Sequence, residues 1–137
     1  MSIRTHIAPL SASELAFLRR SGNVELHEAY GDALATLHGL AARYSGAWYF
    51  VMVPDEAEAL AMLEECISSL ASAPSLVARL RANAEVVKAL RDAAAREGLT
   101  DEVRDAGAGL MQALASESEA LHSTEADRFA SSRAAAG

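Results

Sequence analysis

Large apolar residues recur three or four positions apart in several long segments of this sequence, and Gly, Pro or Ser separates the segments. This spacing places the apolar side chains on one face of an α-helix. The clearest segment runs from Asn23 to Tyr44, and others follow Pro54, Pro74 and Thr100. The apolar stripes of these four segments are Leu26, Tyr30, Leu34, Leu37 and Ala41; Leu60, Leu63, Ile67 and Leu70; Leu76, Leu80, Val87 and Leu90; and Val103, Leu110 and Leu114.

Signals for helix ends agree with these segments. Ser11 and Glu14 have the spacing of a capping box, which predicts a short additional helix that ends near Ser21. Pro54 and Pro74 suit the first turn of a helix, and Gly98 suits the position that follows a last turn. We therefore expect a mainly α fold, a bundle of four or five helices.

One segment lacks helical spacing. Residues 47–53 are mostly aromatic or β-branched, carry no charge and lie between Gly46 and Pro54, a pattern that indicates a buried strand. A strand needs a partner for its backbone groups, and the alternating pattern of residues 2–8 would supply one. A buried helical turn is the other interpretation. The fold class therefore includes the option of a short two-strand β element that joins residues 2–8 and 47–53.

The core of such a bundle is thin. Leu, Ile, Val and Phe make up only about a fifth of the chain, close to the level at which chains are disordered. After Ser116 the only large apolar residues are Leu121 and Phe129. We expect residues 1–115 to form a single helical domain and residues 116–137 a frayed or disordered tail. A core shared with a second copy would add stability, because burying large apolar side chains is favourable.

The charge pattern excludes several classes of partner. The net charge is −7 and the isoelectric point is near 5.0, whereas binding to nucleic acid or to an anionic membrane requires a basic face. The sequence has no apolar run long enough to span a bilayer and no signal peptide at its start. A single cysteine forms no internal disulfide. We expect a cytoplasmic protein, of bacterial origin because Ala and Arg are abundant.

The third and fourth helical segments carry charges of different sign. The third contains acidic residues without a basic one, and the fourth is rich in Arg and Lys. An antiparallel hairpin of the two would bring opposite charges together, although exposed pairs stabilise by only about 1 kcal/mol or less. The acidic residues are Asp55, Glu56, Glu58, Glu64 and Glu65, and the basic residues are Arg79, Arg81, Lys88, Arg91 and Arg96.

No known catalytic or metal-binding pattern is present in the sequence. Glu119 and His122 form the only Glu-x-x-His motif, and a di-iron bundle needs two. His27 and His38 share a helix face, but they lie about 16 Å apart along it, too far to hold one ion. Cys66 has acidic neighbours, which raise the pKa of a thiol rather than activate it. We expect no metal, no cofactor and no catalytic residue, and we lean against an enzyme without excluding one.

Aromatic residues concentrate in one stretch. Four of the seven lie within the seven positions from Tyr44 to Phe50. They anchor a small core, or form an interface with a partner or a second copy, or line a small-molecule pocket in which His and Arg supply polar groups. The candidate interface or pocket residues are His38, Arg43, Tyr44, Trp48, Tyr49 and Phe50.

These observations favour function by contact. We expect a non-catalytic helical module for protein interaction or regulation, whose partner is another protein or a second copy of itself, as in a homodimer. One alternative is a small-ligand- or haem-binding protein, or a small enzyme, with a pocket near residues 38–50. Another is an acidic secretion chaperone or immunity protein that neutralises a basic partner.

Overall fold

The computed structural model describes residues 6–136, apart from residues 22–23 and 46–54, and it describes side chains as far as His122 except those of Arg19 and Ser21. This part of the chain contains five helices and no strand, which confirms the mainly α bundle. The helices are α1 (Ala12–Ser21), α2 (Val24–Ser45), α3 (Glu56–Ser69), α4 (Pro74–Glu97) and α5 (Asp101–Ala136).

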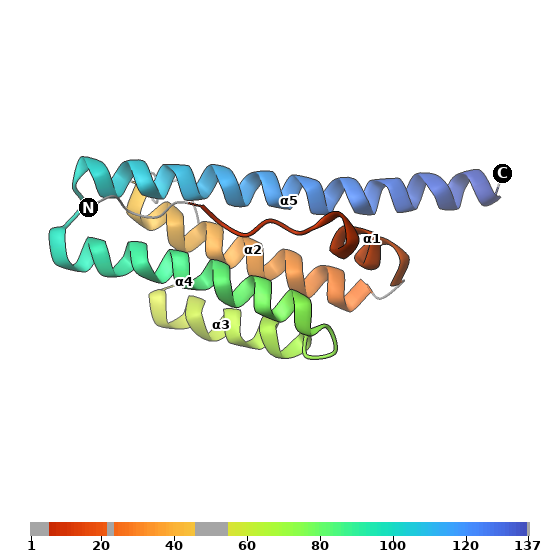
Figure 1. Ribbon diagram of the computed structural model, residues 1–137, viewed down its shortest axis with the longest axis horizontal. Coiled ribbons are helices and arrows are strands. Elements are labelled where there is room, and N and C mark those ends of the chain that lie inside the picture. The colour runs from red at the N-terminus through yellow and green to blue at the C-terminus, as the bar shows by residue number, and fades with distance from the viewer. Residues whose placement is uncertain (1–5, 22–23, 46–54, 137) are drawn as a thin grey trace.

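The bundle is organised around α2, which packs against α3, α4 and α5. Helices α2 and α4 run in one direction and α3 and α5 in the other, so that successive long helices are antiparallel (Figure 1). Helix α1 packs against α5. At the end of the bundle where α1 lies, α5 continues beyond all the other helices (Figure 1).

The helix ends follow the local signals in the sequence. Glu14 accepts a hydrogen bond from the Ser11 backbone N–H at 2.9 Å, and its own N–H donates to Ser11 Oγ at 3.1 Å, which confirms the capping box. Gly98 ends α4 with a positive φ of 79°. One expectation needs correction: α3 begins at Glu56, because Asp55 is its N-cap and the Asp55 carboxylate already accepts from a backbone N–H of the first turn.

The apolar stripes expected from the sequence form one core. Every stripe residue is buried except Leu60, which is half-buried. The core continues along α5 past residue 116, since Glu117 and Leu121 are only 7% and 1% exposed. Helix α5 has no break at that position. The division of the chain into residues 1–115 and 116–137 stays a prediction.

Helices α2 and α5 approach each other closely at Gly107. A Cβ atom at this position would lie 2.9 Å from the backbone nitrogen of Ser45 and 3.1 Å from the carbonyl oxygen of Ala41. Backbone atoms cannot move aside as a flexible side chain can, so this crossing requires a residue without a side chain. The last turn of α2 is thereby held directly against α5.

Residues 6–11, here called the N-terminal arm, lie outside any regular element. Asn83 on α4 is fully buried, and its side-chain amide binds both backbone polar groups of Ala8. Its Oδ1 accepts from the Ala8 N–H at 2.7 Å, and its Nδ2 donates to the Ala8 carbonyl at 3.1 Å. The Leu10 N–H donates to Glu117 at 2.6 Å. The backbone of Ala8 therefore pairs with a side chain rather than with a strand. Residues 2–5 and 47–53 of the expected β element lie outside the described residues.

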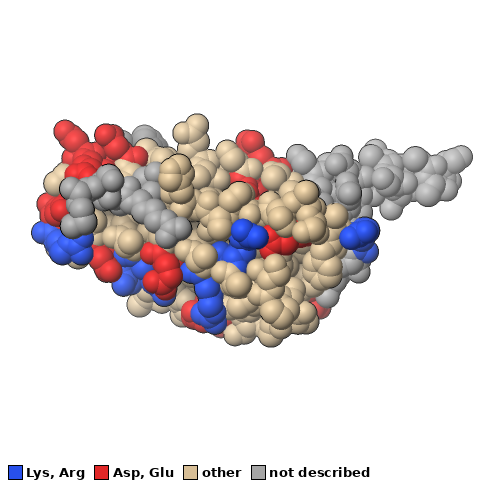
Figure 2. Space-filling view, viewed as in Figure 1, with Lys and Arg blue, Asp and Glu red and all other residues tan. Residues whose placement is uncertain are grey.

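Two ion pairs connect α3 and α4. Arg81 lies 3.5 Å from Glu64, and Arg91 lies 3.2 Å from Glu56. The order of the pairs confirms the antiparallel hairpin expected from the charges. Figure 2 shows that residues of both signs crowd the end of the bundle where α4 passes into α5, while much of the middle of this face is uncharged.

Candidate functional site

An open hollow lies at the crowded, charged end of the bundle, and we call it the arginine hollow. Its volume is about 440 Å³, within the range of about 300–1,000 Å³ that is typical of small-molecule sites. The last turn of α2, the start of α3 and the last turns of α4 form its walls. The lining residues are Arg43, Tyr44, Glu56, Arg91, Ala94, Ala95, Gly98 and Leu99.

The hollow does not continue into the core. A crevice that shares Tyr44, Glu56 and Arg91 with it leads inward between α2, α3 and α4, where leucines such as Leu37 and Leu63 close it. Its free volume is about 10 Å³, which is the room of about one water molecule. Of these two spaces, the outer hollow is the one with room for a ligand larger than a water molecule.

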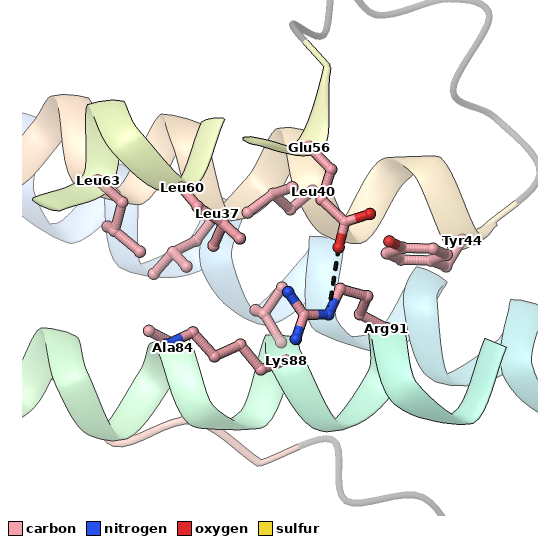
Figure 3. A pocket seen from close by; sticks show the side chains of 10 residues that line it. Leu37, Leu40, Tyr44, Glu56, Leu60, Leu63, Ala84, Lys88 and Arg91 are labelled. Atoms are coloured by element: carbon pink, nitrogen blue, oxygen red, sulfur yellow. Dashed lines mark ion pairs between the residues drawn. The ribbon is translucent and has the colours of Figure 1, made fainter. Parts of the chain in front are cut away.

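Glu56 is the centre of the polar contacts in the hollow. Its carboxylate forms the ion pair with Arg91 Nε and a hydrogen bond with the Tyr44 hydroxyl. Figure 3 shows the carboxylate beside the Tyr44 ring and facing the Arg91 guanidinium, with the leucines of the crevice on the other side. The three residues come from three different helices, so the antiparallel packing of the bundle is what brings them together.

Burial raises the pKa of Tyr44, and the charge of Glu56 adds to this shift, while Arg43 and Arg91 oppose it. The phenol therefore stays protonated at neutral pH and acts as a hydrogen-bond donor rather than as a base. Both arginines lie close enough to influence the same hydroxyl. The lining contains two guanidinium groups and one carboxylate, and Arg91 also lies 3.5 Å from the carboxylate of Asp92.

A second polar group lies beneath the N-terminal arm, and we call it the arm cluster: Glu14, Arg79, Asn83, Glu117 and Tyr30. Arg79 Nη2 donates to Glu14 at 2.6 Å, and Ser75 Oγ donates to the other carboxylate oxygen at 2.7 Å. Burial by itself raises the pKa of Glu14, but its hydrogen bonds outweigh burial and lower the pKa to about 2. These contacts tie α1 and the arm to α4 and α5.

Two atoms of the arm cluster have no hydrogen-bond partner in the described part of the chain, the Tyr30 hydroxyl and Arg79 Nε. Burial raises the pKa of Tyr30, and the carboxylates of Glu117 and Glu14 raise it further. Burial also raises the pKa of Glu117, which its bond from the Leu10 N–H partly offsets.

The structure brings two of the six residues predicted from the sequence to the hollow, Arg43 and Tyr44. His38 is half-buried on α2 and is not part of the lining. Trp48, Tyr49 and Phe50 lie outside the described residues. Sequence reasoning had not selected Arg91 and Glu56 for a site, although the complementary charges of the third and fourth segments were the signal for their pairing.

No family model, curated protein or solved structure matches the chain. Within the described residues, no group of three or more His, Cys, Asp and Glu side chains is placed to hold a metal ion. Cys66 is half-buried against the core, and its pKa is raised by burial first and then by Asp32 and Glu65. None of the helices, over the described residues, combines the length and the apolar character that crossing a membrane requires.

Proposed function

We propose that this protein is a non-catalytic interaction module and that it binds a second copy of itself through the projecting end of α5. The observation that carries the proposal is the length of α5, which runs to Ala136 although its last buried residue among those described is Leu121. Residues 122–136 extend about 22 Å at 1.5 Å per residue, and they point away from the bundle (Figure 1).

A helical end of this kind gains stability from a partner. An isolated helix of about 12–15 residues is marginal in water, because most helical stability comes from packing of one face. Two copies that pair through residues 122–136 would each cover the projecting segment of the other. Such an interface is isologous, because a two-fold axis places the same surface of both copies in contact. The sequence of residues 122–136 contains two acidic residues and two arginines, so two such segments do not repel each other despite the net charge of −7.

Exposed apolar residues lie at the same end of the molecule. Phe17 on α1 is 43% exposed, and Val24, the first residue of α2, is 50% exposed. Helix α1 packs against α5, so this corner adjoins the point where α5 leaves the bundle (Figure 1). Its apolar surface supplies a second area for contact with the partner copy.

Light scattering of the full chain over a range of concentrations tests the proposal. We expect a dimer that dissociates on dilution. Ser131→Pro interrupts the projecting helix because proline lacks the backbone N–H and clashes with the preceding turn, and it should weaken the dimer at least tenfold. The double variant Phe17→Ser, Val24→Ser should weaken it less.

Met62→Ser is the matched control, since Met62 is 48% exposed on α3, away from this corner. Its dimer should dissociate as that of the unchanged chain does. A chain that is monomeric at every concentration would overturn the proposal, and so would a dimer that Ser131→Pro leaves intact.

A further inference from the structure

We propose that the arm cluster is a binding site for an extended peptide of a partner protein, and that the N-terminal arm is the occupant of this site within the chain itself. The arm runs along α5 before α1 begins (Figure 1), between Asn83 on α4 and Glu117 on α5. The peptide that fits has the chemistry of residues 7–10: an aliphatic residue, a small residue, proline and leucine. This proposal is independent of the dimer proposed above.

The polar contacts of the site are made to the backbone of the arm. Asn83 binds both the N–H and the carbonyl of Ala8, and Glu117 accepts from the N–H of Leu10. Every peptide carries these backbone groups, so such hydrogen bonds supply affinity for an extended segment, while pockets for its side chains supply specificity. Asn83 is fully buried and Glu117 is 7% exposed in the occupied site, so both are set to bind a peptide rather than water.

The side chains of the arm indicate which segments fit. Leu10 is buried in the core, and Ile7 is half-buried against it. Pro9 is exposed and has no N–H. Residues 8–10 therefore leave no backbone N–H unpaired, since Ala8 and Leu10 donate and Pro9 has nothing to donate. A partner segment with the same four residue types reproduces each of these contacts.

The arm is an occupant that can be replaced. Residues 6–10 lie outside any regular element, so they can leave the site without breaking a helix. The Tyr30 hydroxyl and Arg79 Nε are buried without a hydrogen-bond partner among the described residues, although they belong to the same cluster. Buried donors without a partner are costly. A segment that offers one more acceptor than the arm would gain the hydrogen bond that the arm does not provide.

The covalent connection of the arm to α1 favours it over a free peptide. A segment tethered close to its site has an effective concentration on the order of millimolar. A free peptide of the same sequence therefore has to reach this range before it displaces the arm. Weakening the arm without changing the site should remove this competition, and the experiment uses that difference.

The probe is a fluorescein-labelled peptide with the sequence of residues 6–11, and fluorescence anisotropy measures its binding to the full chain. Ala8→Pro in the chain removes the N–H that Asn83 binds and leaves Asn83 and Glu117 in place. We expect the peptide to bind this variant at least tenfold more tightly than the unchanged chain, because the arm competes less. Equal affinity for the two chains would overturn the proposal.

Asn83→Leu separates recognition from loosening of the arm. This variant also releases Ala8, but it lacks the amide that binds the peptide, so it should bind the probe at least tenfold more weakly than Ala8→Pro does. Gln112→Leu, at an exposed position on α5, is the matched control and should bind the probe as the unchanged chain does. Comparable binding by Ala8→Pro and Asn83→Leu would contradict recognition of the backbone.

A second peptide gives a test that does not depend on the folding of the Asn83 variant. The Ala8→Pro version of the probe lacks the same N–H and keeps the other side chains. It should bind the Ala8→Pro chain at least tenfold more weakly than the original probe. Equal binding of the two peptides would show that the N–H of residue 8 is not recognised, and it would overturn the proposal.

Light scattering distinguishes a partner peptide from the arm of a second copy. We expect the Ala8→Pro and Asn83→Leu chains to form the same dimer as the unchanged chain. Loss of the dimer in both would show that copies exchange their arms, which would overturn the proposal of a separate partner. A dimer that Ser131→Pro leaves intact would contradict only the function proposed above, so the two failures are distinguishable.

Discussion

The arginine hollow and the arm cluster are built around the same chemical pair, yet the two regions differ in how completely that pair is satisfied. In the arm cluster Arg79 and Glu14 lie 2.6 Å apart, and the Glu14 side chain is 9% exposed. In the hollow Arg91 and Glu56 lie 3.2 Å apart, and each is 35% exposed.

The neighbours of the two carboxylates explain the difference. Glu14 accepts from Ser11, Ser75 and Arg79, so its oxygens are committed to holding α1 and α4 together. Glu56 lies beside open volume at the edge of the bundle. An ion pair between helices is therefore structural where other donors saturate and cover it, and it stays in contact with solvent where both partners are exposed. The predictions below test this contrast.

The largest expected effect is that of Glu14→Gln. Breaking a mostly buried pair costs about 3 kcal/mol of unfolding free energy, whereas Glu56→Gln should cost less than about 1 kcal/mol, because its pair is exposed. Urea denaturation of the two variants measures both. Equal losses would remove the distinction between the regions.

The pH dependence of stability gives a second measure of Glu14. Its pKa in the folded chain is about 2, below the ordinary value of 4.5, so the stability it contributes is present above pH 4.5 and is lost as the pH falls toward 2. The unfolding free energy of the unchanged chain should therefore fall over this window. That of Glu14→Gln should fall less.

Asn83→Leu should cost about 2 kcal/mol, since the N–H and the carbonyl of Ala8 would lose their partner under the arm. Hydrogen exchange should also become faster at Ala8 and Leu10. Gln112→Leu, at an exposed position on α5, is the control and should change stability by less than about 0.5 kcal/mol. Unchanged exchange at Ala8 would show that Asn83 does not hold the arm.

Glu117→Gln should change the unfolding free energy by less than Asn83→Leu does, and it should raise that free energy rather than lower it. The folded pKa of Glu117 is raised, mainly by burial, so the stability linked to this group is fully present below pH 4.5 and is lost as the pH rises through the folded pKa. Glutamine keeps an acceptor for the Leu10 N–H without the charge. Thermal melts from pH 4 to 7 should show the variant gaining relative to the unchanged chain as the pH rises, and a relative loss would contradict this account.

Tyr30→Phe should have the smallest effect. The hydroxyl is buried without a hydrogen-bond partner among the described residues, and removing such a group is neutral or stabilises by up to about 1 kcal/mol. Chemical denaturation is sensitive enough to measure this. A clear loss of stability would mean that the hydroxyl has a partner in solution, such as a buried water.

Periodicity and caps were sufficient to predict the helices and most of the core, because apolar spacing and local hydrogen bonds are encoded within single segments. Polar residues on the apolar stripes were harder to interpret. Asn83 lies between Leu80 and Val87 on its stripe, and Glu117 lies between Leu114 and Leu121 on the next. The sequence analysis did not single out either residue, because their partners, Ala8 and Leu10, lie far away along the chain.

The hollow could be predicted only in part, for the same reason. Arg43 and Tyr44 belong to a stretch that its aromatic residues marked, and the charges of the third and fourth segments favoured pairs such as Glu56 with Arg91. The sequence alone does not specify the register that places that pair next to Tyr44. Register depends on packing between helices, including the contact of Gly107 with the end of α2.

Helix α5 begins two residues after Leu99, at the rim of the hollow, and ends about 54 Å away at 1.5 Å per residue. Between these points it is braced by α2, with Gly107 fixing the crossing near one end. A continuous helix of this length keeps its two ends far apart. A variant at the start of α5 and a variant in residues 122–136 therefore change opposite ends of one continuous helix, so that their effects can be measured separately.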